Sequence, residues 1–339
     1  MNLRPLLFRL GLATAACTLA GCGGKTAAPA ASGPRPLTKI VLQTDWYAQP
    51  EHGGFYQALA KGYYRDAGLD VTIEQGGPNT IAGQKLLMGD IQFCIGRSDD
   101  VIVSVARGLP VVIAGALMQR DPQAIMFHKG SGIRGFKDLD GRNIMTQPGA
   151  NFIPILKQKY GINFSITPLD FGLSRFMADP QFVQQCFVTN EPFYVRKAGA
   201  DIGTLLMSDS GFSPYRVWFT SRKFATENPE AVRAFTAASV RGWREYMEGD
   251  RTAANELIRR DNKQMVPEFM DYGINAMKQY QLVAGDPAKG ETYGQIRPER
   301  IAEQIRQLVE IGVLEQPLKV EDVFDGRFLS SVPLPAAGK

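Results

Sequence analysis

Few side chains in this sequence are of the types that catalysis or metal binding requires. The 339-residue chain holds two histidines, His52 and His128. The second is followed by Lys129 at the end of a predicted strand, which is typical of a surface turn. No Gly-x-Ser-x-Gly, Cys-x-x-Cys or His-Glu-x-x-His pattern occurs. We therefore expect no catalytic residue, no metal site and no cofactor.

Polar and aromatic residues do collect where a predicted strand gives way to a helix, which is where open α/β sheets bind ligands. Asp45 and Trp46 follow the first strand. His52 opens the next helix, and Tyr56 lies within it. An indole beside an imidazole and a carboxylate suits a flat ligand that forms hydrogen bonds. Alternatively, Trp46 packs in the core and His52 caps the helix.

Two further strand ends carry candidate binding residues. Arg97, Ser98 and Asp99 follow the third predicted strand and begin a helix. A simple N-cap would explain Ser98 equally well. Gln119 ends the fourth strand just before a crossing between lobes, where a long polar side chain reaches either side. We expect all four residues to line a binding site.

A turn in the second half of the predicted fold offers backbone donors. Gln147 and Gly149 lie between a strand and a helix, so the amides of this segment are placed to donate to an oxygen of the ligand. A turn without a binding role would explain Pro148 and Gly149 equally well.

Glu191 is the residue that we expect to contact the ligand most directly. With Asn190, it follows the strand predicted at 182–188. A carboxylate accepts two hydrogen bonds from a nitrogen-bearing ring edge, in a fork that a neutral side chain does not match. A first-turn glutamate favoured by the helix dipole is the alternative. Tyr215 and Trp218 lie near the second crossing and are candidates to close over the ligand, although Trp218 also suits a core.

Strands and helices alternate through most of the chain. Strands are predicted at residues 39–43, 71–74, 91–95, 111–117, 125–127, 143–146, 165–169, 182–188, 202–206 and 216–220. Helices are predicted between them at 54–67, 79–88, 99–107, 151–160, 173–178 and 191–197, with Gly68 and Gly89 as stops and Asn79 as a cap. Helices alone follow, at 229–247, 251–260, 266–281 and 298–311.

Such alternation predicts an α/β fold with mostly parallel sheets and helices on both faces. We expect two lobes joined by crossings near Gln123 and near Thr220. Lobe 1 would comprise residues 37–124 and 221–332, with the C-terminal helices packed on it, and lobe 2 residues 125–220. About 300 ordered residues are consistent with two domains.

The first residues predict export. Arg4 and Arg9 precede an apolar run at 10–19, which is too short for a permanent membrane span and typical of a signal peptide at 1–21. The run ends in Leu-Ala-Gly-Cys, which resembles a bacterial lipobox, so we expect lipidation of Cys22. An ordinary signal peptide is the alternative. Residues 22–36 are rich in Gly, Ala, Pro and Ser and predict a flexible tether. We expect the protein in the cell envelope, anchored to the inner or the outer membrane.

Net charge bears on possible nucleic-acid binding, and the cysteines bear on possible disulfide formation. The formal charge of +4 falls to +2 when Arg4 and Arg9 leave with the signal peptide. No basic cluster with interleaved aromatics occurs, so we expect no nucleic-acid partner. Cys94 and Cys186 lie in apolar, strand-like contexts, which favours buried thiols, although an oxidising compartment leaves a disulfide open.

Several short motifs together resemble the thiamine-pyrimidine-precursor (NMT1-like) branch of the periplasmic binding proteins. The similarity runs from about residue 39 to residue 249. The motifs are DW (45–46), HGGFYQA (52–58), KGYY (61–64), AGLDV (67–71), GDIQF (89–93), ARGLPVV (106–112), FKDLDGR (136–142), NEP (190–192) and ENPEAV (227–232). Trp46, His52 and NEP point most narrowly to the pyrimidine branch, whereas the GLDV (68–71) and KDLDG (137–141) pieces are shared with sulfonate, nitrate and taurine binders.

The resemblance implies a type II binding-protein fold, a ligand cleft between the lobes, and an ABC permease and ATPase as partners. In that family the glutamate that matches Glu191 faces the cleft. We expect a monomer that hands a thiamine pyrimidine precursor, such as an aminomethyl-, hydroxymethyl- or formylaminopyrimidine, to the importer. Riboflavin is the second candidate. A sulfonate or nitrate is the third, because an anion demands converging cations and the candidate positions offer acids and aromatics, against only Arg97 and Arg120.

An enzyme is the rival interpretation. Eukaryotic pyrimidine synthases share this fold and opening motif, use pyridoxal phosphate and consume one of their own histidines. The resemblance places their lysine at Arg97, their sacrificial histidine at Val101, and their cysteine run at 208–214, where this chain has no cysteine. These departures predict a binding protein that is not an enzyme.

Overall fold

The computed structural model describes residues 36–78 and 80–330. The predicted signal peptide, Cys22, all but the last residue of the tether, and the cap assigned to Asn79 lie outside the described residues.

The first sheet has the strand order β2-β1-β3-β10-β4. Its members are β1 (Thr38–Gln43), β2 (Leu69–Glu74), β3 (Phe93–Arg97), β4 (Val111–Met118) and β10 (Arg216–Ser221). β1 pairs in parallel with β2 and β3, whereas β10 runs antiparallel between β3 and β4. Every residue of β4 is buried, as expected for a strand covered on both faces.

The second sheet repeats this arrangement in the order β7-β6-β8-β5-β9. Its members are β5 (Gln123–His128), β6 (Asn143–Thr146), β7 (Ser165–Pro168), β8 (Val183–Phe187) and β9 (Ile202–Leu206). β6 pairs in parallel with β7 and β8, and β5 is the antiparallel strand. Each sheet therefore has one antiparallel strand, and in each case it is the strand that follows a crossing.

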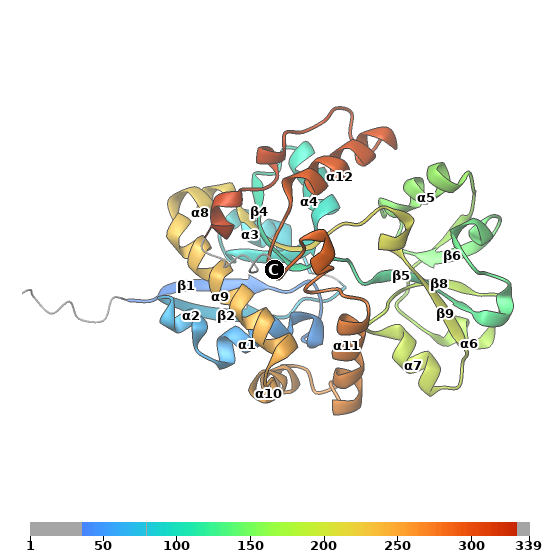
Figure 1. The fold of residues 1–339 in the computed structure, drawn as a ribbon, viewed down its shortest axis with the longest axis horizontal. Coiled ribbons are helices and arrows are strands. Elements are labelled where there is room, and N and C mark those ends of the chain that lie inside the picture. Colours follow the sequence, from blue (N-terminus) through green and yellow to red (C-terminus); the bar gives the residue numbers. More distant parts are fainter. Residues whose placement is uncertain (1–35, 79, 331–339) are drawn as a thin grey trace, which may run out of the picture. The chain divides into compact units, whose positions relative to one another are not determined.

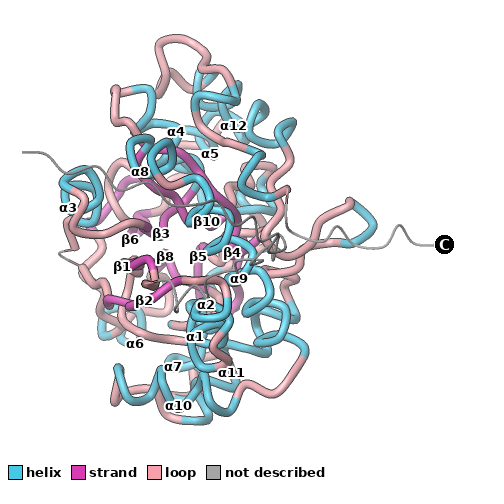
Figure 2. Tube along the Cα trace, turned by 90° about the vertical axis from the view of Figure 1, so that its left-hand side faces the viewer, coloured by secondary structure: helices cyan, strands magenta, loops and turns pink. Residues whose placement is uncertain are grey.

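Helices cover both sheets. Those that alternate with strands are α1 (Gly53–Ala60), α2 (Tyr63–Asp66), α3 (Ala82–Met88), α4 (Ser98–Ala106), α5 (Phe152–Tyr160), α6 (Ser174–Ala178) and α7 (Glu191–Lys197). The C-terminal set is α8 (Arg222–Glu227), α9 (Pro229–Glu248), α10 (Thr252–Asp261), α11 (Pro267–Gln279) and α12 (Pro298–Glu310). Figure 1 shows α5, α6 and α7 around the second sheet. In Figure 2 the magenta strands lie among cyan helices.

The C-terminal helices pack on elements of the first sheet, as predicted. α9 and α10 contact α1, and α12 contacts α4. The α1–α9 contact is unusually close because glycines face aromatic rings: a Cβ atom on Gly54 would lie 2.1 Å from the Trp243 ring. On the other helix, a Cβ on Gly242 would lie 2.2 Å from the carbonyl oxygen of Gly54. The Gly-Gly pair at 53–54 thus has a packing role.

The predicted fold class is confirmed, with differences in detail. The helix predicted at 54–67 is two helices, because Gly62 adopts a left-handed conformation (φ 74°) that ends α1. α8 was not predicted, and β5 and β10 run antiparallel to their neighbours. The sheet memberships place the crossings before Gln123 and before Arg216.

Cys94 in β3 and Cys186 in β8 are buried free thiols. Burial raises the pKa of Cys94 to about 12 and raises the pKa of Cys186 well above its ordinary value. Because the thiolate is the reactive form, we expect both thiols of a variant that begins at residue 36 to resist an aromatic disulfide reagent until the chain is unfolded. Rapid reaction of either thiol in the native protein would contradict this burial.

Candidate functional site

A cleft of about 440 Å³ opens at the carboxyl ends of strands from both sheets. Loops after β1, β2 and β3 meet loops after β6, β7 and β8 there, and the antiparallel strands β5 and β10 begin there. The lining residues are Asp45, Trp46, Gln49, Gly77, Pro78, Gly96, Arg97, Asp100, Gln123, Gln147, Leu169, Phe171, Leu173, Gln185, Phe187, Asn190, Glu191, Tyr194 and Arg216. This location is the general ligand site of open α/β sheets.

The structure brings six of the predicted site residues together in this cleft. They are Asp45, Trp46, Arg97, Gln147, Asn190 and Glu191. The other eight do not line it. They are His52, Tyr56, Ser98, Asp99, Gln119, Gly149, Tyr215 and Trp218.

His52 lies behind the cleft wall. It lines a small adjoining cavity of about 20 Å³ and is 2% exposed. Burial lowers its pKa to about 4, so the imidazole is neutral at neutral pH. Its Nε2 lies 3.0 Å from Asp45 Oδ1, and a neutral ring that donates here holds the carboxylate of Asp45 in place.

Ser98 and Asp99 are buried in polar networks. Ser98 Oγ accepts from the backbone N–H of Tyr215 and donates to Gln304, so it links the residue before β10 to α12 and does not cap α4. Asp99 Oδ2 accepts from Arg97 and, at 2.9 Å, from Asn151 Nδ2 at the start of α5. Asp99 therefore links the end of β3 to the start of α5 without lining the cleft itself.

The remaining predicted residues are structural in their contacts. The Gln119 side chain donates to the carbonyls of Thr292 and Gln295. The Trp218 indole is fully buried and donates to Thr236. Tyr56 donates to Asp261 from the core of α1, and Tyr215 lies against the Arg300 guanidinium. Gly149 adopts a left-handed φ of 80° in its turn.

Glu191 is half-buried and has an open acceptor. Its Oε2 accepts from the backbone N–H of Phe187 at 2.8 Å, and its Oε1 has no hydrogen-bond partner among the described residues. Burial raises the pKa of Glu191 to about 7, against the lowering effect of the Phe187 amide. A ligand that donates to Oε1 would satisfy the carboxylate and favour its charged form.

Both arginines of the cleft are already paired with acids. Arg97 contacts Asp99 and Asp100 at 3.1 Å each. Arg216 pairs with Asp45, and its Nη1 lies 3.5 Å from Asp121 Oδ2. Because their charges are balanced by carboxylates, these arginines do not make the cleft a strong anion site.

Aromatic rings form much of the remaining wall. Trp46 and Phe171 lie with ring centroids 5.1 Å apart at 35°, and they come from loops of different sheets. Phe171 has a φ of 61°, a conformation that costs a non-glycine residue roughly 1–3 kcal/mol and is common at functional sites. The Arg216 guanidinium lies over the Phe187 ring, with its Cζ 5.4 Å from the ring centroid. The rings offer stacking surfaces to a flat ligand.

Sequence reasoning missed several residues of the cleft. Phe171 follows a strand end and could have been found by the rule that selected Trp46. The same rule could not find Gln123 and Arg216, because they begin β5 and β10 and reach the cleft through the antiparallel direction of those strands. Gln185 was missed because it lies in the interior of a predicted strand.

The buried acids predict an unusual dependence of stability on pH. Burial raises the pKa of Asp121 and of Glu191 to about 7 each, and that of Asp99 to about 6. A carboxyl group whose pKa is higher when folded binds more protons in the folded state, so its contribution to the free energy of unfolding falls as pH rises from about 4 to 7. His52, with its pKa lowered, acts in the opposite direction but is one group against several.

We therefore expect urea unfolding to give a lower free energy of unfolding at about pH 7.5 than at about pH 5.5. The isosteric variant Asp121→Asn should flatten this slope. A free energy of unfolding that rises steadily over this interval would contradict the burial of these acids.

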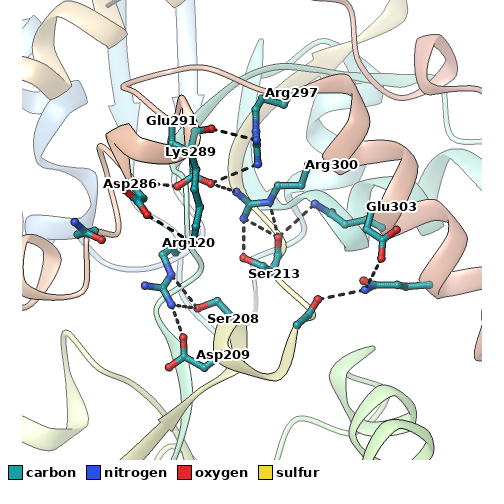
Figure 3. A pocket seen from close by; sticks show the side chains of 14 residues that line it. Arg120, Ser208, Asp209, Ser213, Asp286, Lys289, Glu291, Arg297, Arg300 and Glu303 are labelled. Carbon is teal, nitrogen blue, oxygen red and sulfur yellow. Dashed lines mark hydrogen bonds and ion pairs between the residues drawn. The ribbon is translucent and has the colours of Figure 1, made fainter. Parts of the chain in front are cut away.

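A second pocket, of about 310 Å³, lies at the crossings between the sheets (Figure 3). Most of its charged residues pair with one another, such as Arg120 with Asp209, Lys289 with Asp286, and Arg300 with Glu291. Arg300 also donates to the backbone carbonyls of Gln119 and Ser213. The pocket is therefore a structural ion-pair network that joins the crossings to the C-terminal segment.

No helix within 36–78 and 80–330 is long and apolar enough to cross a membrane. The same residues contain no group of three or more His, Cys, Asp or Glu side chains placed to hold a metal ion.

Comparison with known proteins places the chain in a family. A family model described as NMT1/THI5 like matches residues 49–253, which is more than half of the chain. The chain belongs to the NMT1/THI5-like family. The match includes Gln49, Arg97, Gln123, Glu191 and Arg216 of the cleft.

Characterised relatives of this family member include binding proteins and enzymes. The riboflavin-binding protein RibY of Chloroflexus aurantiacus is 27% identical over 64% of this chain and 65% of its own length. The formylaminopyrimidine-binding protein of Halalkalibacterium halodurans is 25% identical over 93% of this chain and 97% of its own. A 4-amino-5-hydroxymethyl-2-methylpyrimidine phosphate synthase of Saccharomyces cerevisiae is 23% identical over 73% and 82%.

Solved structures confirm the fold. The periplasmic aliphatic sulphonate binding protein SsuA of Escherichia coli aligns with a TM-score of 0.64 at 14% identity, over 84% of this chain and 91% of its own. At this identity the likeness shows the periplasmic-binding-protein fold and does not bear on the ligand.

Proposed function

We infer that this family member is the solute-binding protein of an ABC importer and captures a small heteroaromatic nutrient, a thiamine pyrimidine precursor such as formylaminopyrimidine. The observation that carries this inference is Glu191. Its Oε1 is a carboxylate oxygen with no hydrogen-bond partner among residues 36–78 and 80–330, in a cleft walled by Trp46, Phe171 and Phe187. An aminopyrimidine donates hydrogen bonds from its edge and stacks through its face, so it matches both features.

The comparison with the formylaminopyrimidine-binding protein supports this choice, because the match spans nearly the whole of both chains. Paired arginines weigh against an anion such as a sulfonate or nitrate, since Arg97 and Arg216 each already contact acids.

Capture would occur by closure of two lobes around the ligand. We assign lobe 1 to the first sheet with the C-terminal helices and lobe 2 to the second sheet, which keeps the expected division apart from a few residues at each crossing. Polar contacts between them lie at or beside the cleft, among them Arg97 to Gln123 at 2.7 Å, Asn151 to Asp99 at 2.9 Å and Asn190 to Gln49 at 3.4 Å. A ligand that touches both lobes would add to these contacts and favour the closed state.

The partners follow from this role. The closed protein, a monomer, would deliver its ligand to a permease and an ATPase in the membrane. Lipidation of Cys22 would hold the protein at the membrane surface, and the tether would allow the two lobes to approach the permease.

Catalysis is not part of the proposal. Arg97 stands where the synthases carry a lysine, and its guanidinium is held by acids on two sides. Val101, at the position of the sacrificial histidine, is 3% exposed and packs in the core.

Riboflavin is the second candidate, favoured by the similarity to RibY and by the aromatic wall of the cleft. Calorimetric titration of the purified protein with formylaminopyrimidine and with riboflavin tests the assignment. We expect one formylaminopyrimidine per chain, bound at least tenfold more tightly than riboflavin. The reverse order would make this a flavin importer, and failure to bind either compound would contradict a heteroaromatic ligand.

A further inference from the structure

Gln123 presents a fixed hydrogen-bond donor to the cleft. It begins β5, lines the cleft and is 4% exposed. Arg97 Nη1 donates to its side-chain oxygen at 2.7 Å. Because a guanidinium has donors and no acceptor, the atom that it contacts must be Oε1. The Nε2 group is thereby turned away from Arg97, and no acceptor for it lies among residues 36–78 and 80–330.

The side-chain amide of Gln185 is also held in one orientation. It lies in β8, lines the cleft and is 7% exposed. Thr146 Oγ1 donates to its Oε1 at 2.5 Å, and the backbone N–H of Gln147 donates to the same oxygen at 3.3 Å. A backbone N–H only donates, so the amide orientation is again determined by its neighbours. Its Nε2 likewise has no acceptor in the described part of the chain.

The two amides share one face of the second sheet. In the antiparallel pairing of β5 with β8, Gln123 lies opposite Phe187, and Gln185 is two residues from Phe187 on the same strand. Side chains two residues apart in a strand point to the same face, so Gln123 and Gln185 are diagonal neighbours. Their NH₂ groups therefore open on the same part of the cleft.

We propose that Gln123 and Gln185 form a donor pair that recognises a carbonyl oxygen on the ligand, while Glu191 takes the ligand's amino group. This assignment rests on the proposed function and sharpens it. A ligand that covers these amide donors excludes water from them, so a donor left without an acceptor in the complex would lose its hydrogen bonds, and the site favours a ligand that supplies one.

The donor pair discriminates between two related pyrimidines. Formylaminopyrimidine carries a formamide carbonyl, whereas the corresponding aminomethylpyrimidine carries a protonated amine at the same position. An ammonium group there would meet two N–H donors and gain no acceptor from the pair, so its binding would be disfavoured. The structure thus favours the formylated compound over the free amine.

Isosteric Gln→Glu variants test the pair. Gln185→Glu and Gln123→Glu each keep the oxygen that accepts from Thr146 or Arg97, but they replace the NH₂ donor with an acceptor. Calorimetry should show that wild-type protein binds formylaminopyrimidine at least tenfold more tightly than aminomethylpyrimidine. Each variant should weaken the formylated compound tenfold or more and leave the amine unchanged or tighter. This inversion of preference is not produced by simple loss of folding.

Gln181→Glu is the matched control. It adds the same charge next to β8 at an exposed position outside the cleft and should change neither affinity. If the wild type binds both pyrimidines equally, or if the Glu variants weaken both to the same extent, the donor pair is wrong while the proposed function stands.

If the wild type binds neither pyrimidine, the proposed ligand is wrong, and riboflavin becomes the probe. Its ring carbonyls are acceptors, so weaker binding of riboflavin by Gln185→Glu and Gln123→Glu would retain the donor pair. Unchanged riboflavin binding in both variants, or no binding of any of the three compounds, would overturn it.

Discussion

Replacing Glu191 by glutamine is expected to weaken the binding of formylaminopyrimidine tenfold to a hundredfold, with little change in the thermal stability of the empty protein. Glutamine retains an oxygen that accepts from the Phe187 N–H, so the start of α7 is preserved. It presents an NH₂ group where Oε1 faced the cleft, so a donor meets the ligand's donors. Hydrogen bonds to charged groups contribute about 1.5–3 kcal/mol, which corresponds to the expected loss of affinity.

Glu191→Ala separates the two roles of this residue. It should weaken binding to a similar extent, but it should also lower the melting temperature, because the N–H of Phe187 loses its partner. Glu256→Gln, at an exposed position of α10, is the matched control and should alter neither property. Wild-type affinity in Glu191→Gln, measured by calorimetry, would make Glu191 a structural residue only.

Gly242→Ala should destabilise the protein by about 2 kcal/mol or more. The new Cβ would lie 2.2 Å from the carbonyl oxygen of Gly54 and 2.7 Å from Ala58 Cβ, so α9 must move away from α1. The gain in helix propensity, about 1 kcal/mol, does not offset this overlap. Because α1 follows the loop that carries Trp46, ligand affinity should fall as well.

Gly83→Ala is the matched control, because it adds the same methyl group to a helix at a position with free space. Gly83 lies in α3, and a Cβ atom there meets nothing within 4 Å. This variant should gain roughly 0.5–1 kcal/mol from helix propensity alone. Urea denaturation of the two variants and the wild type measures both effects. Equal stability of Gly242→Ala and Gly83→Ala would contradict the close contact between α1 and α9.

The sequence was most informative where hydrophobic periodicity and turn residues agree. β6, α7 and β9 begin and end where periodicity predicted, because each is bounded by polar or glycine-containing segments. The break at Gly62 was missed since apolar residues continue on both sides of it, and a glycine inside a helical pattern does not by itself reveal its φ. The antiparallel direction of β5 and β10 depends on long-range pairing and leaves no local signal.

The candidate site divides in the same way. Residues at the ends of parallel strands, such as Trp46 and Glu191, were found because that rule needs only the strand assignments. Ser98 and Gln119 satisfied the same rule, yet their hydrogen bonds go to α12 and to the segment before it, which are distant in sequence. Gln185 was missed because the direction of its free amide depends on Thr146 in a neighbouring strand.

Native mass spectrometry of the protein purified from its own host tests most directly whether the cleft carries an intact heteroaromatic nutrient. We expect one small molecule per chain that dissociates on denaturation, contains a nitrogen-bearing aromatic ring, and binds again unchanged when it is returned to the empty protein. An adduct that survives denaturation, a compound altered by the protein, or a bound alkanesulfonate without such a ring would contradict the account.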